Sequence, residues 1–165
     1  MSRLEIRGFE AADLARVPLQ PALLRLLPEL ARPGYGRLLT ANGSLAWTGL
    51  KAGRVVGLGG LLELHRGSAR AWTLLDGAGL DRDDWKAITR AAARALGQAA
   101  ESGRWWRLEA EVVAGYRAGR RWAELLGFRF EGLKWGAGAD GADVELYAVK
   151  LPSVRARRSQ HAGSA

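Results

Sequence analysis

The feature that most constrains the fold is one stretch near the C-terminal end of the chain, Tyr116 to Leu151. Within it, Arg120 to Leu126 has the apolar spacing of a helix, and Gly127 follows as a C-cap because glycine reaches the left-handed conformation without steric cost. Phe128 to Trp135 and Val144 to Leu151 alternate like strands on either side of a glycine-containing loop. The stretch therefore predicts a helix followed by a β-hairpin that closes a sheet. The residues predicted on the apolar face of the helix are Trp122, Leu125 and Leu126, and those on one side of the first strand are Phe128 and Phe130.

The rest of the chain supplies the other elements of this sheet. Strands are predicted at 3–9, 44–51, 54–65, 69–75 and 104–113, and helices at 10–17, 19–30 and 81–102, with a loop at 32–36. Leu4, Ile6 and Trp106 are expected to point inward from their strands. The succession of strand, long helix and strand predicts that the two strands are parallel neighbours. The fold class is α/β (α+β), with a mixed, mostly antiparallel sheet of about seven strands flanked by about four helices.

Composition limits the classes of protein that need to be considered. The 165 residues favour one domain, predicted at 1–151, with a core large enough to fold without crosslinks. The absence of cysteine excludes disulfides, cysteine metal sites and cysteine nucleophiles. No run approaches the roughly 20 apolar residues of a membrane helix, and the first residues lack the apolar region of a signal peptide. We therefore expect a cytoplasmic protein without a membrane partner.

The chain is basic, with a formal net charge of +8. Residues 152–165 carry three arginines and no acid, and we predict that they form a disordered tail. Positive charge favours anionic partners such as nucleic acid, although it also serves solubility alone.

Two segments resemble a known family. The run RRWAELLGFRFEGLKWGAGADGADVELYAVKL resembles the C-terminal end of the GNAT fold, that of the Gcn5-related N-acetyltransferases, and LEIRGFEAADLARV resembles its first strand and helix. The resemblance implies that acetyl-CoA binds where the fourth and fifth strands diverge, with its pyrophosphate on backbone N–H groups at the start of the following helix. The cofactor-binding residues so implied are Leu74, Leu75, Asp76, Gly77 and Arg82.

This helix start departs from the pattern of the family. The family has Gln or Arg, two residues, Gly, one residue and then Gly or Ala, and this chain does not. Asp81 is instead predicted to cap the helix, with Asp84 three residues later reaching back in a capping box, and Asp83 adds a third carboxylate. The sequence thus leaves two interpretations open, a cofactor site and a helix that is simply well capped.

The catalytic candidates also allow two interpretations, a catalytic role and an ordinary structural role. Glu63 and His65 stand two residues apart, and a histidine beside a carboxylate suits a general base, although charged residues at alternate positions also mark the solvent face of a strand. Glu109 and Glu111 are further candidates for the base. The tyrosine that the family often uses as general acid is replaced by Ala123, so Tyr116 is the nearby substitute, or else a half-buried aromatic residue at a helix start. The candidates named for catalysis are Glu63, His65 and Tyr116.

Three functions are compatible with these observations. The first is an N-acyltransferase that moves acetyl from acetyl-CoA to an unidentified amine of a small molecule or protein by direct attack. The second is a catalytically degenerate structural or interaction protein, similar to GNAT-like proteins of bacteriophage virions, whose basic tail contacts nucleic acid or a virion protein; its location would then be the virion. The third is a toxin-type transferase that acts on aminoacyl-tRNA. The resemblance favours the first narrowly.

Overall fold

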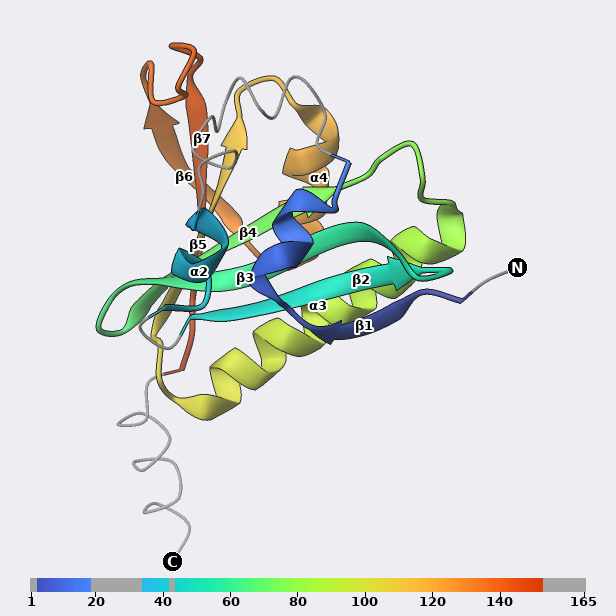
Figure 1. The fold of residues 1–165 in the computed structure, drawn as a ribbon. Helices are drawn as coiled ribbons and strands as arrows, with labels where there is room; N and C mark the ends of the chain where they lie inside the picture. The colour runs from blue at the N-terminus through green and yellow to red at the C-terminus, as the bar shows by residue number, and fades with distance from the viewer. Residues whose placement is uncertain (1–2, 19–33, 42–43, 153–165) are drawn as a thin grey trace, which may run out of the picture.

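The computed structural model of the chain describes residues 3–18, 34–41 and 44–152. Its centre is a seven-stranded sheet in the order β1-β2-β3-β4-β5-β7-β6, in which only β4 and β5 are parallel neighbours (Figure 1). The predicted mixed, mostly antiparallel sheet is thereby confirmed. The strands are β1 (Glu5–Gly8), β2 (Leu45–Lys51), β3 (Arg54–His65), β4 (Ser68–Leu75), β5 (Arg107–Val113), β6 (Arg129–Lys134) and β7 (Val144–Lys150).

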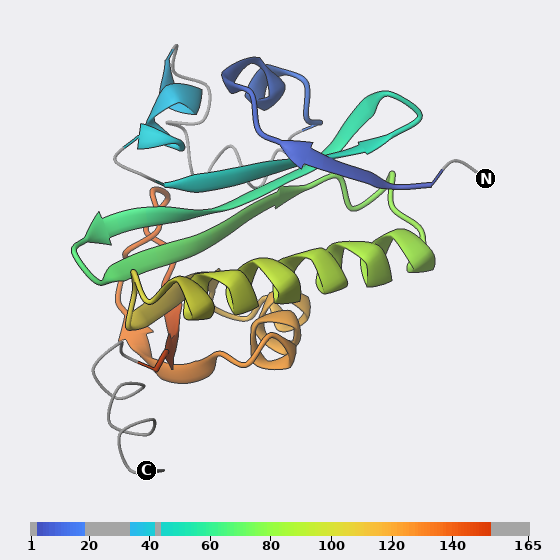
Figure 2. The same cartoon turned by 90° about the horizontal axis from the view of Figure 1, so that it is seen from below.

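Helices cover both faces of the sheet. The 3-10 helix η1 (Ala11–Ala15) and the short helix α2 (Tyr35–Leu38) lie on one face, and α3 (Arg82–Ser102) and α4 (Arg117–Leu125) lie on the other (Figure 2). Tyr35 opens α2, so the loop predicted at 32–36 ends earlier than expected. The helix predicted at 19–30 and the predicted tail lie outside the described residues.

Each face of the sheet has its own apolar cluster. Under α3 and α4, the cluster centres on Leu61, Trp105, Leu108 and Tyr147, all of which are buried. Under η1, a smaller cluster includes Leu14, Val17, Val55, Leu58 and Leu74. The consecutive antiparallel strands β2, β3 and β4 form a meander, and each of them contributes to both faces because successive side chains alternate.

One buried ion pair fixes η1 to the sheet. The fully buried carboxylate of Asp13 accepts two hydrogen bonds of 2.8 Å from Arg7 on β1 and one of 2.7 Å from the hydroxyl of Thr48 on β2. Burial acts to raise the pKa of Asp13, but these hydrogen bonds favour the charged form more strongly, so its pKa is lowered. Asp13 therefore remains ionised and joins β1, η1 and β2.

Several residues predicted to face the interior do not. Trp106 is 47% exposed and its neighbour Trp105 is 1% exposed, because β5 begins only at Arg107 and strand alternation does not apply to the turn before it. Leu125 is 71% exposed because it is the last residue of α4 and points away from the sheet. Ile6 and Phe130 lie on the edge strands β1 and β6, where they too remain exposed.

Candidate functional site

The strands β4 and β5 diverge partway along their length. They pair only from Ser68–Arg107 to Ala71–Ala110. Beyond this point, residues 72–75 of β4 pair with β3 alone and residues 111–113 of β5 pair with β7 alone. One backbone edge of β4 is therefore unpaired among the described strands. Leu74 and Leu75, two of the implied cofactor residues, lie on this segment, where a pantetheine amide could pair with the free edge.

Helix α3, which follows the divergence, begins at Arg82, and the backbone N–H groups at its N-terminal end already bind carboxylates of the chain itself. The side chain of Asp81 accepts hydrogen bonds from the backbone N–H groups of Asp83 (2.9 Å) and Asp84 (3.0 Å), and the side chain of Asp84 accepts one from the backbone N–H of Asp81 (3.0 Å). This is the predicted capping box. The two carboxylates thus use the N–H groups that an anion site at a helix start would need.

A lysine from a distant strand completes this cluster. The ammonium of Lys51, at the end of β2, lies 2.9 Å from Asp81 Oδ2 and 2.5 Å from Asp84 Oδ2. The hydrogen bonds that Asp81 accepts from the backbone N–H of Asp84 and from Lys51 lower the pKa of Asp81 to about 2. Asp81 therefore stays charged at neutral pH, and Lys51 is committed to the two carboxylates. We call Lys51, Asp81 and Asp84 the cap cluster.

The loop before α3 is also closed on itself. Asp76 receives 2.9 Å and 3.1 Å hydrogen bonds from Arg54 Nη1 and from the backbone N–H of Gly79. A Cβ at Gly79 would come within 2.3 Å of Asp76 Oδ2, so the loop that contains Gly77 packs against this carboxylate. Arg82 is exposed, and no ion pair is recorded for it within the described part of the chain. Of the implied phosphate ligands, Arg82 is thus the one with a free charge.

Two tryptophans connect α3 to α4 on the same face of the sheet. Trp85, in the first turn of α3, meets Trp122 of α4 edge to face, with ring centroids 6.4 Å apart. The indole N–H of Trp122 donates a 3.0 Å hydrogen bond to Thr89, whose hydroxyl donates in turn to the carbonyl of Trp85. Aromatic side chains therefore join the first turn of α3 to the second half of α4.

The structure does not bring the three catalytic candidates together. Glu63 lies beside Ala69, in the paired half of the sheet, where its Oε2 accepts hydrogen bonds from Trp105 Nε1 (3.1 Å) and Arg104 Nη2. A β-bulge separates it from His65, which is exposed and contacts the carbonyl of Arg66. Glu63 thus anchors the turn that follows α3, and its two-residue spacing from His65 does not produce a shared face.

Tyr116 and Ala123 occupy different ends of α4. Tyr116 is exposed at the N-cap, where its ring lies over Gly119. Ala123 is buried in the core at the position where the family often has tyrosine. Tyr116 is the only one of the three catalytic candidates at the open end of the divergence.

Glu109 and Glu111 belong to a network of charges on the face opposite α3 and α4. Arg70 donates to Glu109 (2.6 Å) and lies 2.9 Å from Glu111. The network continues to β6 through Arg107–Glu131 and Lys134–Glu111. Cations and carboxylates balance in this network, so Glu109 and Glu111 are each held in ion pairs with arginine or lysine.

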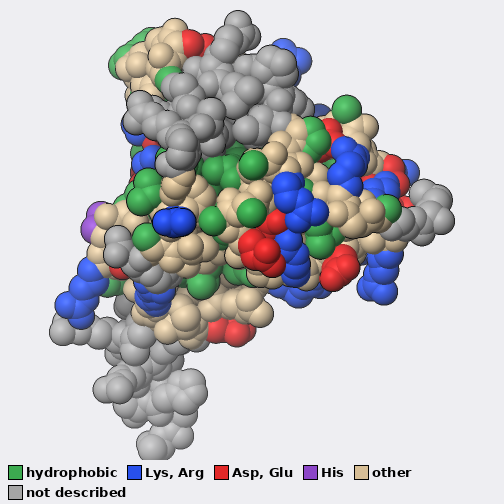
Figure 3. All heavy atoms as spheres, in the orientation of Figure 1, with side chains coloured by type: hydrophobic (Ala, Val, Ile, Leu, Met, Phe, Trp, Pro, Cys, Tyr) green, Lys and Arg blue, Asp and Glu red, His purple; other side chains and the backbone are tan. Residues whose placement is uncertain are grey.

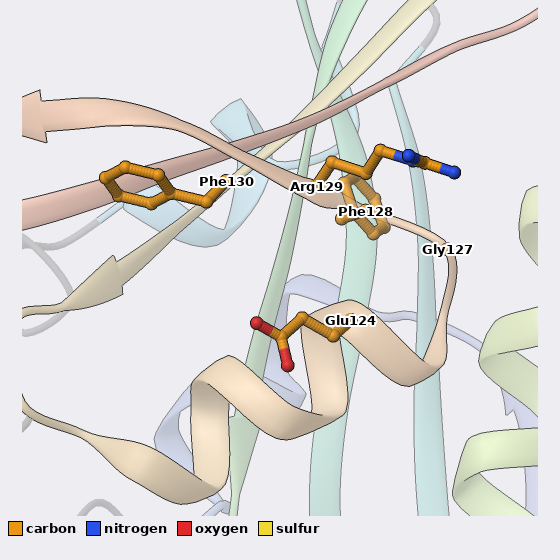
Figure 4. Close-up of a pocket in the computed structure, with 5 residues that line it drawn as sticks. All are labelled: Glu124, Gly127, Phe128, Arg129 and Phe130. Carbon is orange, nitrogen blue, oxygen red and sulfur yellow. The ribbon is translucent and has the colours of Figure 1, made fainter.

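The described residues fit coenzyme A only in part. The free edge of β4 suits the pantetheine arm, but the start of α3 does not suit a pyrophosphate, because its N–H groups and its nearest lysine are held within the cap cluster. A surface hollow of about 510 Å³ lies elsewhere, between α4 and β6 (Figure 4). We therefore assign no catalytic step to the cofactor.

Comparisons with known proteins identify the fold. No sequence model of a protein family matches the chain, and no curated protein sequence matches it. Many solved structures do. A ribosomal L7/L12 alpha-N-protein acetyltransferase in complex with coenzyme A is 16% identical, with a TM-score of 0.66 over 90% of this chain and 94% of its own. A ribosomal-protein-alanine N-acetyltransferase from Brucella melitensis is 18% identical (TM-score 0.67; 89% and 99% covered). A GNAT-family acetyltransferase from Bacillus anthracis is 19% identical (TM-score 0.66; 90% and 95% covered). The chain therefore has the GNAT fold.

Proposed function

We propose that this chain is a GNAT-fold binding protein that does not use acetyl-CoA. The observation that carries the proposal is the cap cluster, which fills the helix start where the fold holds a pyrophosphate. Trp85 and Trp122 support it, because their rings join the two helices beside the diverging strands. Glu63 supports it as well, since its carboxylate serves Trp105 and Arg104.

The test is a titration of the full chain with acetyl-CoA and with coenzyme A, followed by calorimetry and by thermal unfolding. A ligand with a Kd of 100 µM would stabilise the protein by about 1.4 kcal/mol at 1 mM. For a domain of this size that corresponds to a rise in Tm of roughly 3–6 °C. We expect a rise below ~1 °C at 1 mM and no binding heat. Saturable binding of either ligand would refute the proposal.

The second candidate is the N-acetyltransferase that the sequence favours narrowly. The unpaired edge of β4 at residues 72–75 supports it, as does the position of Tyr116 beside the open end of β5. This function predicts transfer of acetyl from acetyl-CoA to an amine, with release of free coenzyme A. A thiol assay with spermidine, lysine and a peptide with a free N-terminus as acceptors distinguishes the two candidates. Release of thiol that depends on the acceptor would establish the second.

A further inference from the structure

The exposed side of α3 carries a row of four cations. Arg82, Lys86, Arg90 and Arg94 follow one another at intervals of four residues, and all four are exposed. At 3.6 residues per turn they fall within an arc of about 120°, and at 1.5 Å per residue each interval advances about 6 Å along the axis. The row therefore spans about 18 Å of a helix that runs along one face of the sheet (Figure 2). We call these four residues the α3 ridge.

The acidic residues of the helix leave most of this charge in place. The three arginines of the ridge make no ion pair within the described part of the chain, and Lys86 lies 3.0 Å from Asp83. Both partners of that pair are exposed, and exposed ion pairs contribute little, so another anion exchanges readily for Asp83. Asp84 belongs to the cap cluster, and Glu101 lies about 10 Å beyond Arg94 along the axis. The ridge is therefore a positively charged surface.

The ridge ends beside the start of β1. Arg94 lines a surface hollow together with Arg3, Leu4, Glu5 and Ile6. Arg3 and Glu5 carry opposite charges, so the start of β1 adds no net charge at this end. The positive charge of this surface therefore comes from α3 itself.

The face of the sheet that carries η1 has a different arrangement of charge. Many of its cations are paired with carboxylates, as in Arg7–Asp13 and Arg70–Glu109. Figure 3 views this face and shows Asp and Glu side chains next to Lys and Arg. The charge of the α3 ridge thus differs from that face in lacking a matching set of carboxylates.

The uncharged residues on the exposed side of α3 restrict the kind of partner. They are Ala93, Gly97, Gln98 and Ser102, all small or polar. Protein interfaces centre on aromatic and apolar anchors, and a helix that lies on a membrane buries an apolar face. Proteins that bind single-stranded nucleic acid stack the bases on aromatic side chains. The exposed side of α3 offers none of these groups.

Evenly spaced cations without apolar neighbours fit a partner whose charges are also evenly spaced. In a double helix the phosphates of each strand follow one another at about 3.4 Å along the axis, so every second phosphate comes close to the 6 Å interval of the ridge. Three of the four cations are arginines, whose planar guanidinium donates two parallel hydrogen bonds to a phosphate. Such contacts hold the backbone and carry no sequence information.

We propose that the α3 ridge binds the phosphate backbone of a double-stranded nucleic acid without reading its sequence. The inference rests on the proposed function, because it names the partner of the binding protein. Arg90 lies nine residues beyond Asp81, about 13 Å along the axis, so substitutions at Arg90 and Arg94 leave the start of α3 unchanged. A chain that binds both a duplex and acetyl-CoA would refute the proposed function alone, and a chain that binds neither would refute this inference alone.

The probe is a fluorescein-labelled DNA duplex of about 20 base pairs, compared with an RNA duplex and a single DNA strand of the same sequence. Fluorescence anisotropy with the full chain measures each Kd. Three to four phosphate contacts give a slope of about −2.7 to −3.6 for the logarithm of the association constant against that of the salt concentration. Binding should therefore weaken roughly 40- to 150-fold between 50 and 200 mM salt. Either duplex should bind more tightly than the single strand, and the tighter of the two identifies DNA or RNA as the source of the phosphates.

Matched variants locate the site. The double variant Arg90→Gln with Arg94→Gln should reduce the steepness of the salt dependence by about 1.8 and raise the Kd at least ~10-fold at 50 mM salt. The control, Arg37→Gln with Arg66→Gln, removes the same charge from two exposed arginines, one on α2 and one in the β3–β4 turn, and should leave the slope unchanged. All four positions are exposed, so circular dichroism should show folded protein in both variants.

Four results would overturn the proposal. Equal weakening in the two double variants would mean that net charge alone accounts for binding. Loss of binding when Arg155, Arg157 and Arg158 are replaced by glutamine, with none in the ridge variant, would assign the nucleic acid to the tail. Displacement of the duplex by polyglutamate at equal charge would indicate an acidic protein as the partner. Binding to phosphatidylserine vesicles but not to either duplex would indicate a membrane.

Discussion

The role of Glu63 can be measured as stability, because the structure makes it an anchor. Its Oε2 accepts from the indole N–H of Trp105, a side chain that is 1% exposed, and from Arg104, which also lies 4.7 Å from the centre of the Trp105 ring. Glu63→Ala leaves the buried indole N–H without this acceptor. A buried donor that loses its partner costs about 1–3 kcal/mol.

Glu63→Gln has a different expected result. The amide oxygen of glutamine can accept from Trp105, but a neutral acceptor is weaker than a carboxylate, so we expect a loss of about 1 kcal/mol or less. At roughly 2–4 °C per kcal/mol, the alanine variant should lower the Tm by about 2–12 °C and the glutamine variant by no more than about 4 °C. The assays are thermal unfolding, which gives the Tm, and urea unfolding, which gives the free energy of unfolding, both followed by far-UV circular dichroism.

A double-mutant cycle isolates the bond. Trp105→Phe keeps an aromatic ring and removes the donor, so Glu63→Ala should cost less in that background than in the parent chain. The coupling energy should be about 1–2 kcal/mol, in the range for side chains in direct contact. If Glu63→Ala leaves the free energy of unfolding unchanged, the anchoring role is wrong and Glu63 is free to serve as a base.

Four further predictions address other parts of the fold. The pKa of Asp81 is lowered from 3.8 to about 2, so its contribution to stability is present above pH 4 and is lost as pH falls toward 2; Lys51→Met removes one of the interactions that lower this pKa, so its Tm should fall less than that of the parent chain between pH 4 and pH 2. Asp13→Asn should lower the free energy of unfolding by about 3 kcal/mol in urea, because it breaks a buried ion pair. Gly97→Ala should raise it by about 0.5–1 kcal/mol, since a Cβ there meets nothing within 4 Å in the middle of α3. Gly67→Ala should lower it by at least about 1 kcal/mol, since Gly67 has a φ of +86° and its Cβ would meet the Trp106 ring at 2.1 Å.

Local patterns predicted the elements whose causes are local. The three strands of the meander, the capping box of α3 and the left-handed Gly127, with a φ of +92°, follow from alternation, from Asp81 and Asp84, and from the freedom of glycine. The prediction that Trp106 faces the interior was wrong. Alternation indicates which face a side chain takes only within a strand, and the position at which β5 begins depends on the turn after α3.

The candidate site depended on contacts that are distant in sequence. Lys51 reaches Asp81 across 30 residues, and Glu63 reaches Trp105 across 42. No spacing rule connects such pairs, so the sequence could indicate that Asp81 caps a helix but not which cation would neutralise it. The sequence also could not predict where the pairing between β4 and β5 ends. That point is set by the twist of the whole sheet rather than by residues 72–75 themselves.

The cap cluster links the stability of this fold to its function. A helix start has a few free N–H groups and a partial positive charge, and these can serve either an external anion or the chain's own carboxylates. Asp81 and Asp84 take the N–H groups, and Lys51 ties both carboxylates to β2, so the same atoms that would hold a phosphate now join α3 to the sheet. An external phosphate would have to displace a charged group with a pKa of about 2 and break its contact with Lys51. The geometry of the diverging strands is thus retained while the helix start serves the fold, and binding is expected at a different surface.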